Sequence, residues 1–158
     1  RLGQALTECQ GKKDGDGRAA KEAGYLFANL QRYAKHMTAK AERYRQESPG
    51  QCTTVLKKIQ KEFAGTDYAS DAAKKLAELT EDKTFQMEVK AEKKYRVIAR
   101  AAGTIPPYPT VAADRSGWKR RYGSGVKQIR SRIASFKKQY PESRFVRSAQ
   151  GLLDGISG

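Results

Sequence analysis

Few side chains in this 158-residue sequence have the types and spacing that catalysis or metal binding requires. His36 is the only histidine, and it has neither the second metal ligand nor the triad partners that such chemistry needs. Asp14 and Asp16 match the first and third positions of a calcium-binding loop, but Ala19 stands where that loop needs glycine and Tyr25 where it needs glutamate. We therefore expect a turn in this segment, with no metal and no cofactor.

The sequence also lacks the recurring motifs of enzymes. It contains no G-x-G-x-x-G, no phosphate-loop lysine motif, no G-x-S-x-G, no H-E-x-x-H and no Cys-x-x-Cys. Acidic residues such as Glu78, Glu81 and Asp82 fall at the ends of expected helices, where favourable interaction with the helix termini accounts for them. We expect a protein that is not an enzyme.

The two cysteines, Cys9 and Cys52, are enough for one disulfide bond. The residues between them predict a long helix over residues 18–46, which at about 1.5 Å per residue would extend roughly 43 Å. If residues 2–10 fold back antiparallel to that helix, the two thiols lie near its opposite ends and are too far apart to bond. We expect Cys52 in the core, since its counterpart in the repeat described below is Ile129.

The charge balance is strongly basic. The chain has 32 Lys and Arg against 17 Asp and Glu, a net charge of +15 and a pI near 9.9. Such a field favours anionic partners of every kind, including nucleic acid, acidic proteins and lipid surfaces. No apolar run is long enough to span a bilayer. Because the sequence begins at Arg1 and not at methionine, we expect a module of a longer chain.

Residues 118–147 carry the strongest local charge bias, with ten Lys and Arg and a single acid, Glu142. The run WKRRYGSG at 118–125 places aromatic rings beside cations and a Gly-Ser-Gly before an expected helix, so backbone N–H groups and guanidinium groups could hold a phosphate there. No recognition helix, RNP motif or zinc finger accompanies it, and both nucleic acid and an acidic protein surface stay open as partners. The candidate anion-binding or partner-binding residues are Trp118, Lys119, Arg120, Arg121, Tyr122, Lys127, Arg130 and Arg132.

The elements that position these residues are predicted to be helices. Apolar residues recur every three or four positions from Ala19 to Tyr44 and again over 84–102, which is typical of amphipathic helices. Residues 103–117 contain three prolines, which predict an extended connector. We expect its apolar side chains to pack against the first half of the chain; these are Ile105, Tyr108 and Val111.

The strongest organising feature is a repeat at an offset of 77 residues between 56–79 and 133–156. Both copies predict an amphipathic helix, a short break, a Thr or Ser N-cap and a second amphipathic helix. Stacked helical hairpins of this kind bury a shared apolar core and usually bind other proteins. In the first copy the matching residues are Leu56, Ile59, Phe63, Thr66, Tyr68, Ala69, Ala72, Leu76 and Leu79; in the second they are Ile133, Phe136, Tyr140, Ser143, Phe145, Val146, Ala149, Leu153 and Ile156.

The second copy carries the pattern Tyr140-Pro141-x-Ser143 with Ala149 six residues further on. It resembles the hairpin of bacterial envelope tetratricopeptide-like proteins of the Tol-Pal coordination and outer-membrane assembly lipoprotein types. The first copy looks like a relative in which Gly65-Thr66 replaces Pro-x-Ser. This resemblance implies a periplasmic or secreted setting and a role in binding proteins.

The sequence thus predicts an all-α fold of stacked antiparallel helical hairpins, tetratricopeptide-like, with about six to seven helices and one long Pro-rich loop. We expect one helical-repeat domain over 1–158, with a first half at 1–102, a connector at 103–117 and a second half at 118–158. The expected function is a non-catalytic interaction or scaffold module that binds a protein or another domain of its parent chain. The alternative is nucleic-acid or polyanion binding through residues 118–147.

Overall fold

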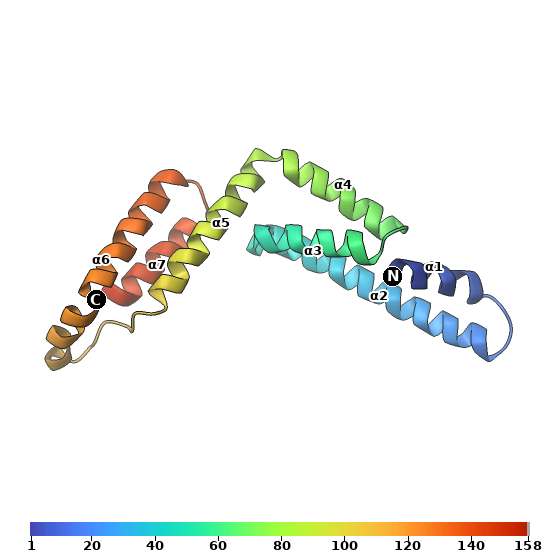
Figure 1. The fold of residues 1–158 in the computed structure, drawn as a ribbon, viewed down its shortest axis with the longest axis horizontal. Helices are drawn as coiled ribbons and strands as arrows, with labels where there is room; N and C mark the ends of the chain where they lie inside the picture. The colour runs from blue at the N-terminus through green and yellow to red at the C-terminus, as the bar shows by residue number, and fades with distance from the viewer. Residues whose placement is uncertain (158) are drawn as a thin grey trace. The chain divides into compact units, whose positions relative to one another are not determined.

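A computed structural model of the chain describes residues 1–157, and within that range it is all-helical, without a strand. The all-α prediction is therefore confirmed, and Figure 1 shows the seven α-helices in chain order. The elements are α1 (Leu2–Lys12), α2 (Arg18–Glu47), α3 (Pro49–Glu62), α4 (Asp67–Glu81), α5 (Lys83–Ala102), the 3-10 turn η1 (Ala112–Asp114), α6 (Arg115–Gln139) and α7 (Phe145–Ser157).

The helix boundaries follow local chemistry. Pro49 ends α2 and opens α3, because proline lacks the N–H that a helix interior needs but is tolerated in the first turn. The side chain of Asp82 accepts a hydrogen bond from the Phe85 N–H at 3.0 Å and so caps the start of α5. Thr66 occupies the N-cap position of α4, but its hydroxyl donates to the Phe63 carbonyl at 2.7 Å. The predicted side-chain cap is therefore not formed there.

The chain divides into two compact units, unit 1 (residues 1–86) and unit 2 (residues 87–158). The division lies just after the start of α5, and not in the Pro-rich connector where the sequence placed it. Most of α5 belongs to unit 2 because its inward side chains pack with α6 and α7; they are Ala91, Ile98 and Ala102.

In unit 1, α1 and α3 both pack along α2, and α4 packs on α3 (Figure 1). The start of α1 lies against the end of α3, where Gly3 is buried and a Cβ on it would lie only 2.3 Å from the Ala64 carbonyl oxygen. Glycine at this position permits the close approach of the two helices. The thiols of Cys9, on α1, and Cys52, on α3, are free in this structure.

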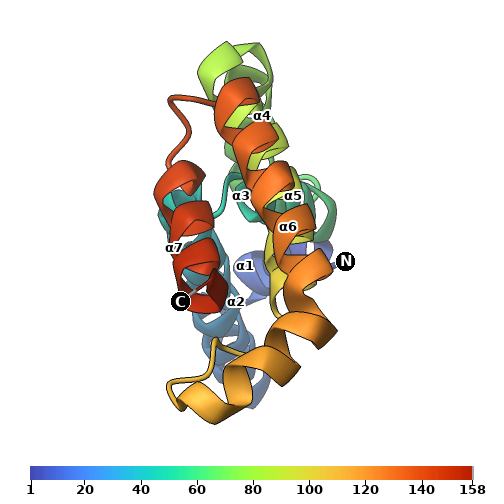
Figure 2. The ribbon, with the colours of Figure 1, turned by 90° about the vertical axis from the view of Figure 1, so that its left-hand side faces the viewer.

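In unit 2, α6 and α7 form a hairpin beside α5, and Figure 2 shows α6 and α7 side by side. Two residues of the connector join this core. Ile105 is buried, and Tyr108 packs edge-on against Trp118 with ring centroids 5.1 Å apart. The indole N–H of Trp118 donates to the Pro106 carbonyl at 3.2 Å. Val111, which we expected to be packed, is instead 58% exposed.

Glu88 on α5 fixes the turn between α6 and α7. Its side chain is 12% exposed and accepts hydrogen bonds from the Ser143 hydroxyl at 3.1 Å and from the Arg144 N–H at 3.2 Å. The Arg144 guanidinium lies 3.4 Å from the same carboxylate. A negative charge at the start of α7 interacts favourably with the helix dipole, so this buried carboxylate is well satisfied.

The two predicted hairpins share their local geometry. Phe63 and Tyr140 each end a helix by donating a backbone hydrogen bond of 2.9 Å to the residue four positions back, Ile59 and Phe136. The next bond also matches, from Thr66 to Phe63 and from Ser143 to Tyr140, at 3.1 Å in both. Cys52 and Ile129 are 2% and 3% exposed, so the predicted pair of core positions is confirmed.

Candidate partner-binding grooves

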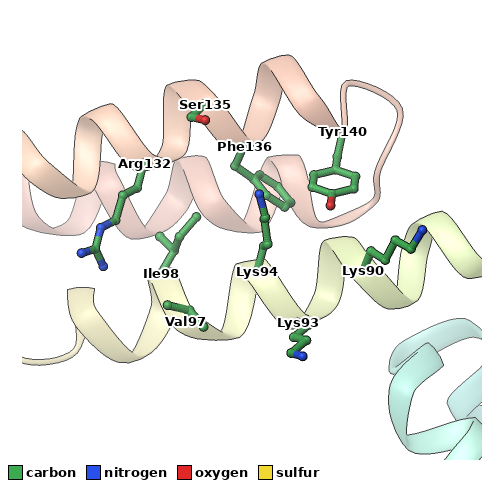
Figure 3. Close-up of a pocket in the computed structure, with 9 residues that line it drawn as sticks. All are labelled: Lys90, Lys93, Lys94, Val97, Ile98, Arg132, Ser135, Phe136 and Tyr140. Carbon is green, nitrogen blue, oxygen red and sulfur yellow. The ribbon is translucent and has the colours of Figure 1, made fainter.

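The cations that the sequence singled out do not form one site. Lys119, Arg120, Arg121, Lys127, Arg130 and Arg132 are all exposed on α6. At about 100° per residue they fall on different sides of the helix. Arg120 and Lys127 lie opposite the buried face of Trp118 and Phe136, whereas Arg132 lies on the side toward α5 (Figure 3).

The aromatic residues of the predicted site are committed to packing. Trp118 is 9% exposed and contacts both Tyr108 and Tyr122, the latter at a centroid distance of 5.7 Å. Little of the Trp118 ring is therefore exposed for stacking on a base. Two of the cations lie over aromatic faces, Lys119 at 5.9 Å from the Tyr108 centroid and Arg121 at 5.6 Å from the Tyr122 centroid.

The predicted phosphate site at Gly123, Ser124 and Gly125 is also not formed. We expected these residues to precede a helix, but α6 begins at Arg115 and runs through all three. Their N–H groups are inside the helix, where they bond to carbonyls one turn back, so they are not free to bind an anion. The sequence predicted a break here because glycine is unfavourable within a helix. In the structure, Trp118 and Val126 pack in the core of unit 2, and this packing keeps the turn helical.

The structure shows instead a groove between α5 and α6, which we name groove 2 (Figure 3). It has a volume of about 630 Å³ and lies within unit 2. Ile98 reaches from α5 toward α6, while Phe136 and Tyr140 point from α6 toward α5. Its lining consists of Lys90, Lys93, Lys94, Val97, Ile98, Arg132, Ser135, Phe136 and Tyr140.

Groove 2 combines an apolar floor with a cationic rim. Val97 is 58% exposed, which leaves apolar surface open beside the buried side chains of Ile98 and Phe136. No carboxylate lines the groove, and none of its four cations forms an ion pair with another side chain of residues 1–157. Lys94 is held in place by a hydrogen bond to the Gln139 side chain and lies 5.9 Å from the Tyr140 ring centroid.

Of the predicted residues, only Arg132 belongs to this groove; the three lysines of α5 were not among the candidates. Their spacing could have indicated the groove, because residues at i, i+3, i+4 and i+7 share one helix face. Lys90, Lys93, Lys94 and Val97 have this spacing. The sequence pattern predicted which face of α5 is buried, but it did not show which helix would lie beside the lysines next to that face.

Unit 1 has a corresponding groove between α2 and α4 above α3, which we name groove 1. Its volume is about 530 Å³, and Leu56, Ile59 and Tyr68 contribute its apolar lining. Here the charges are mixed, since Glu42, Asp71 and Glu78 lie among the lysines and Lys75 pairs with Glu42. Groove 1 therefore lacks the single sign of charge that marks groove 2.

Burial raises the pKa of the Cys52 thiol, with a further contribution from the nearby Glu42 carboxylate. This thiol is 2% exposed, so it is neither open to solvent nor readily ionised. His36 is exposed, and residues 1–157 contain no group of three side chains that could hold a metal ion. None of their helices is long and apolar enough to cross a membrane.

Neither a family model, nor a curated protein, nor a solved structure matches this chain.

Proposed function

We propose that this chain is a non-catalytic protein-interaction module whose helical units bind partners in the grooves beside their hairpins. Groove 2 is the observation that carries this proposal. It leaves Val97 exposed next to the apolar core of unit 2, and exposed apolar surface in a groove with a polar rim is typical of protein-binding sites. The partner is a separate protein or another domain of the parent chain.

The hairpin repeat supports the same proposal. Helical hairpins present the helix faces that are not packed in a core as binding surfaces, and both units here have such a surface. The resemblance of the turn at 140–149 to bacterial envelope tetratricopeptide-like proteins favours a partner in that compartment. On this basis the proposed setting is the periplasm or cell exterior of a bacterium.

Site-specific photo-crosslinking in extracts of the source cells tests the proposal. A photoreactive phenylalanine would replace Val97 in groove 2 or Ala39 in groove 1, with Ala134, exposed on the side of α6 away from α5, as the matched control. We expect discrete crosslinked proteins from at least one groove position and none from Ala134. If both groove positions give none, or Ala134 gives the same products, the module does not bind proteins in its grooves.

Polyanion binding is the second candidate, and the distribution of charge favours it. Unit 2 has sixteen Lys and Arg against five Asp and Glu, whereas unit 1 has sixteen against twelve. If nucleic acid is the ligand, affinity for a duplex should fall log-linearly with rising salt. Charge reversal at Arg120, Arg121 and Arg130 should then abolish binding of the duplex. Binding of a protein partner in groove 2 should persist in the same variant.

A further inference from the structure

Groove 2 differs from groove 1 in a way that identifies the chemistry of its occupant. The two grooves have similar volumes and similar apolar floors, but three carboxylates line groove 1 and none lines groove 2. In groove 1 these acids offset the lysines around them. In groove 2 none of the four cations forms an ion pair with a carboxylate of residues 1–157.

We propose that groove 2 binds an acidic amphipathic α-helix of a partner protein. The apolar face of that helix would lie on Val97, Ile98 and Phe136, and its carboxylates would meet the cationic rim. This inference rests on the proposed function and adds the class of partner to it. The rim cations are Lys90, Lys93 and Lys94 on α5 and Arg132 on α6.

The dimensions of the groove suit a helix. On α5 the lining runs from Lys90 to Ile98, and on α6 from Arg132 to Tyr140. Each span is nine residues, whose eight rises of about 1.5 Å extend about 12 Å along the helix axis, which matches roughly two turns of a bound helix. Apolar residues of the ligand at i, i+3 or i+4, and i+7 would therefore all reach the floor.

The walls of groove 2 also favour a helix over an extended peptide. Both walls are helices, α5 and α6, whose backbone N–H and C=O groups are already paired within them. An extended peptide would bring its own unpaired backbone groups against the apolar floor, with no sheet edge to bond them. A helix satisfies its backbone internally and presents only side chains to the groove.

The rim is arranged to contact carboxylates. Lys94 is oriented across the groove by Gln139 and the face of Tyr140. Because its side chain is already ordered, it loses less conformational entropy when a ligand binds. Arg132 extends from the opposite wall in Figure 3, which places positive charge on both sides of the floor. An acidic ligand helix between these walls would have cations within reach of both of its flanks.

Fluorescence anisotropy with a defined peptide tests this proposal. The probe is a labelled, end-blocked helical peptide of about 18 residues, with leucines in one stripe and glutamates flanking it. The controls are the same composition scrambled to break the stripe, and the same stripe with each glutamate replaced by glutamine. We expect the full chain to bind the acidic amphipathic peptide at least tenfold more tightly than either control, and a duplex DNA competitor to displace it poorly.

Two charge-matched variants locate the site. K90E/K93E/R132E reverses three rim charges and should weaken peptide binding at least tenfold; R120E/R121E/K127E reverses three exposed charges elsewhere on α6 of the same unit and should change it less than threefold. V97S, which removes apolar surface without changing charge, should weaken binding about fivefold. Far-UV circular dichroism and Trp118 fluorescence would confirm that each variant is folded.

Three results would overturn the inference. The first is equal binding of the scrambled peptide and the second is equal weakening by both triple variants, since either would show general attraction to polyanions. The third is absence of peptide binding. If Val97 nevertheless crosslinks a protein in extracts, the proposed function stands and only the partner class is wrong; if neither groove crosslinks any protein, the proposed function fails independently of the peptide result.

Discussion

At the scale of single residues, the repeat predicted the burial of Cys52, which the number of cysteines alone could not predict. Two cysteines permit a disulfide, but the match of Cys52 with Ile129 predicts an apolar core position for its thiol. The structure buries Cys52, at the start of α3, and Ile129, on α6, whereas Cys9 on α1 is half-buried. Cys52 therefore acts as a small apolar side chain.

Thiol labelling of the native protein tests this assignment. Only the thiolate reacts, and burial both raises the pKa of Cys52 and excludes the reagent, so Cys52 should stay unmodified at pH 8 while Cys9, which is half-buried, reacts. Mass spectrometry after limited iodoacetamide treatment, with and without 8 M urea, reports each site. We expect one labelled cysteine in the native protein and two in urea; prompt labelling of Cys52 without urea would contradict its burial.

At the scale of elements, the sequence determined α2 and α5 closely because their apolar periodicity and breaking residues agree. The predicted helix at 18–46 corresponds to α2 (Arg18–Glu47), and the predicted helix at 84–102 corresponds to α5 (Lys83–Ala102). The two do not agree in α6, whose first three turns contain Gly117, Gly123 and Gly125. Local propensity opposes a helix there, and the contacts of Trp118 with the connector outweigh it.

The candidate site was less predictable than the fold because it depends on tertiary packing, which local sequence patterns do not show. Helical periodicity shows which face of α5 is buried, but it does not show that α6 will lie across from Lys90, Lys93 and Lys94. The sequence pattern instead favoured the densest run of cations, at 119–121. That run lies in unit 2, the unit that contains groove 2, whereas the groove itself depends on the tertiary arrangement of two helices far apart in sequence.

The glycines of α6 provide a test at this scale. Gly123→Ala should stabilise unit 2 by about 0.5–1 kcal/mol, since a Cβ there meets no atom within 4 Å and alanine loses less backbone entropy on folding. Gly125→Ala is the matched control. Its Cβ would lie 3.2 Å from Ile105 Cδ1, so the gain should be smaller or reversed.

Urea unfolding followed by Trp118 fluorescence measures both variants, because the only tryptophan lies at the start of α6. A higher midpoint for Gly123→Ala than for Gly125→Ala is the expected order. A large loss of stability in Gly123→Ala would mean that this turn is not helical in solution.

At the scale of the whole molecule, the two units share the geometry of one hairpin turn but differ in their number of helices and in charge. Each combines an amphipathic helix with a hairpin whose turn has the same backbone hydrogen bonds. Most of the net charge belongs to unit 2, which has few acids to offset its cations. We infer that the repeat supplies a common scaffold with two grooves, and that the charge pattern of each groove sets its own choice of partner.

The division into two units predicts separable unfolding, which two equivalent substitutions can test. Ile59→Val in unit 1 and Ile133→Val in unit 2 each remove one methylene from a core side chain that is 1% or 2% exposed. Each should cost about 0.5–1.5 kcal/mol. Because Trp118 reports on unit 2 alone, Ile133→Val should lower the urea midpoint seen by fluorescence, whereas Ile59→Val should leave it unchanged and shift only the transition seen by far-UV circular dichroism. Equal shifts of the fluorescence midpoint in both variants would show that the two units unfold as one cooperative body.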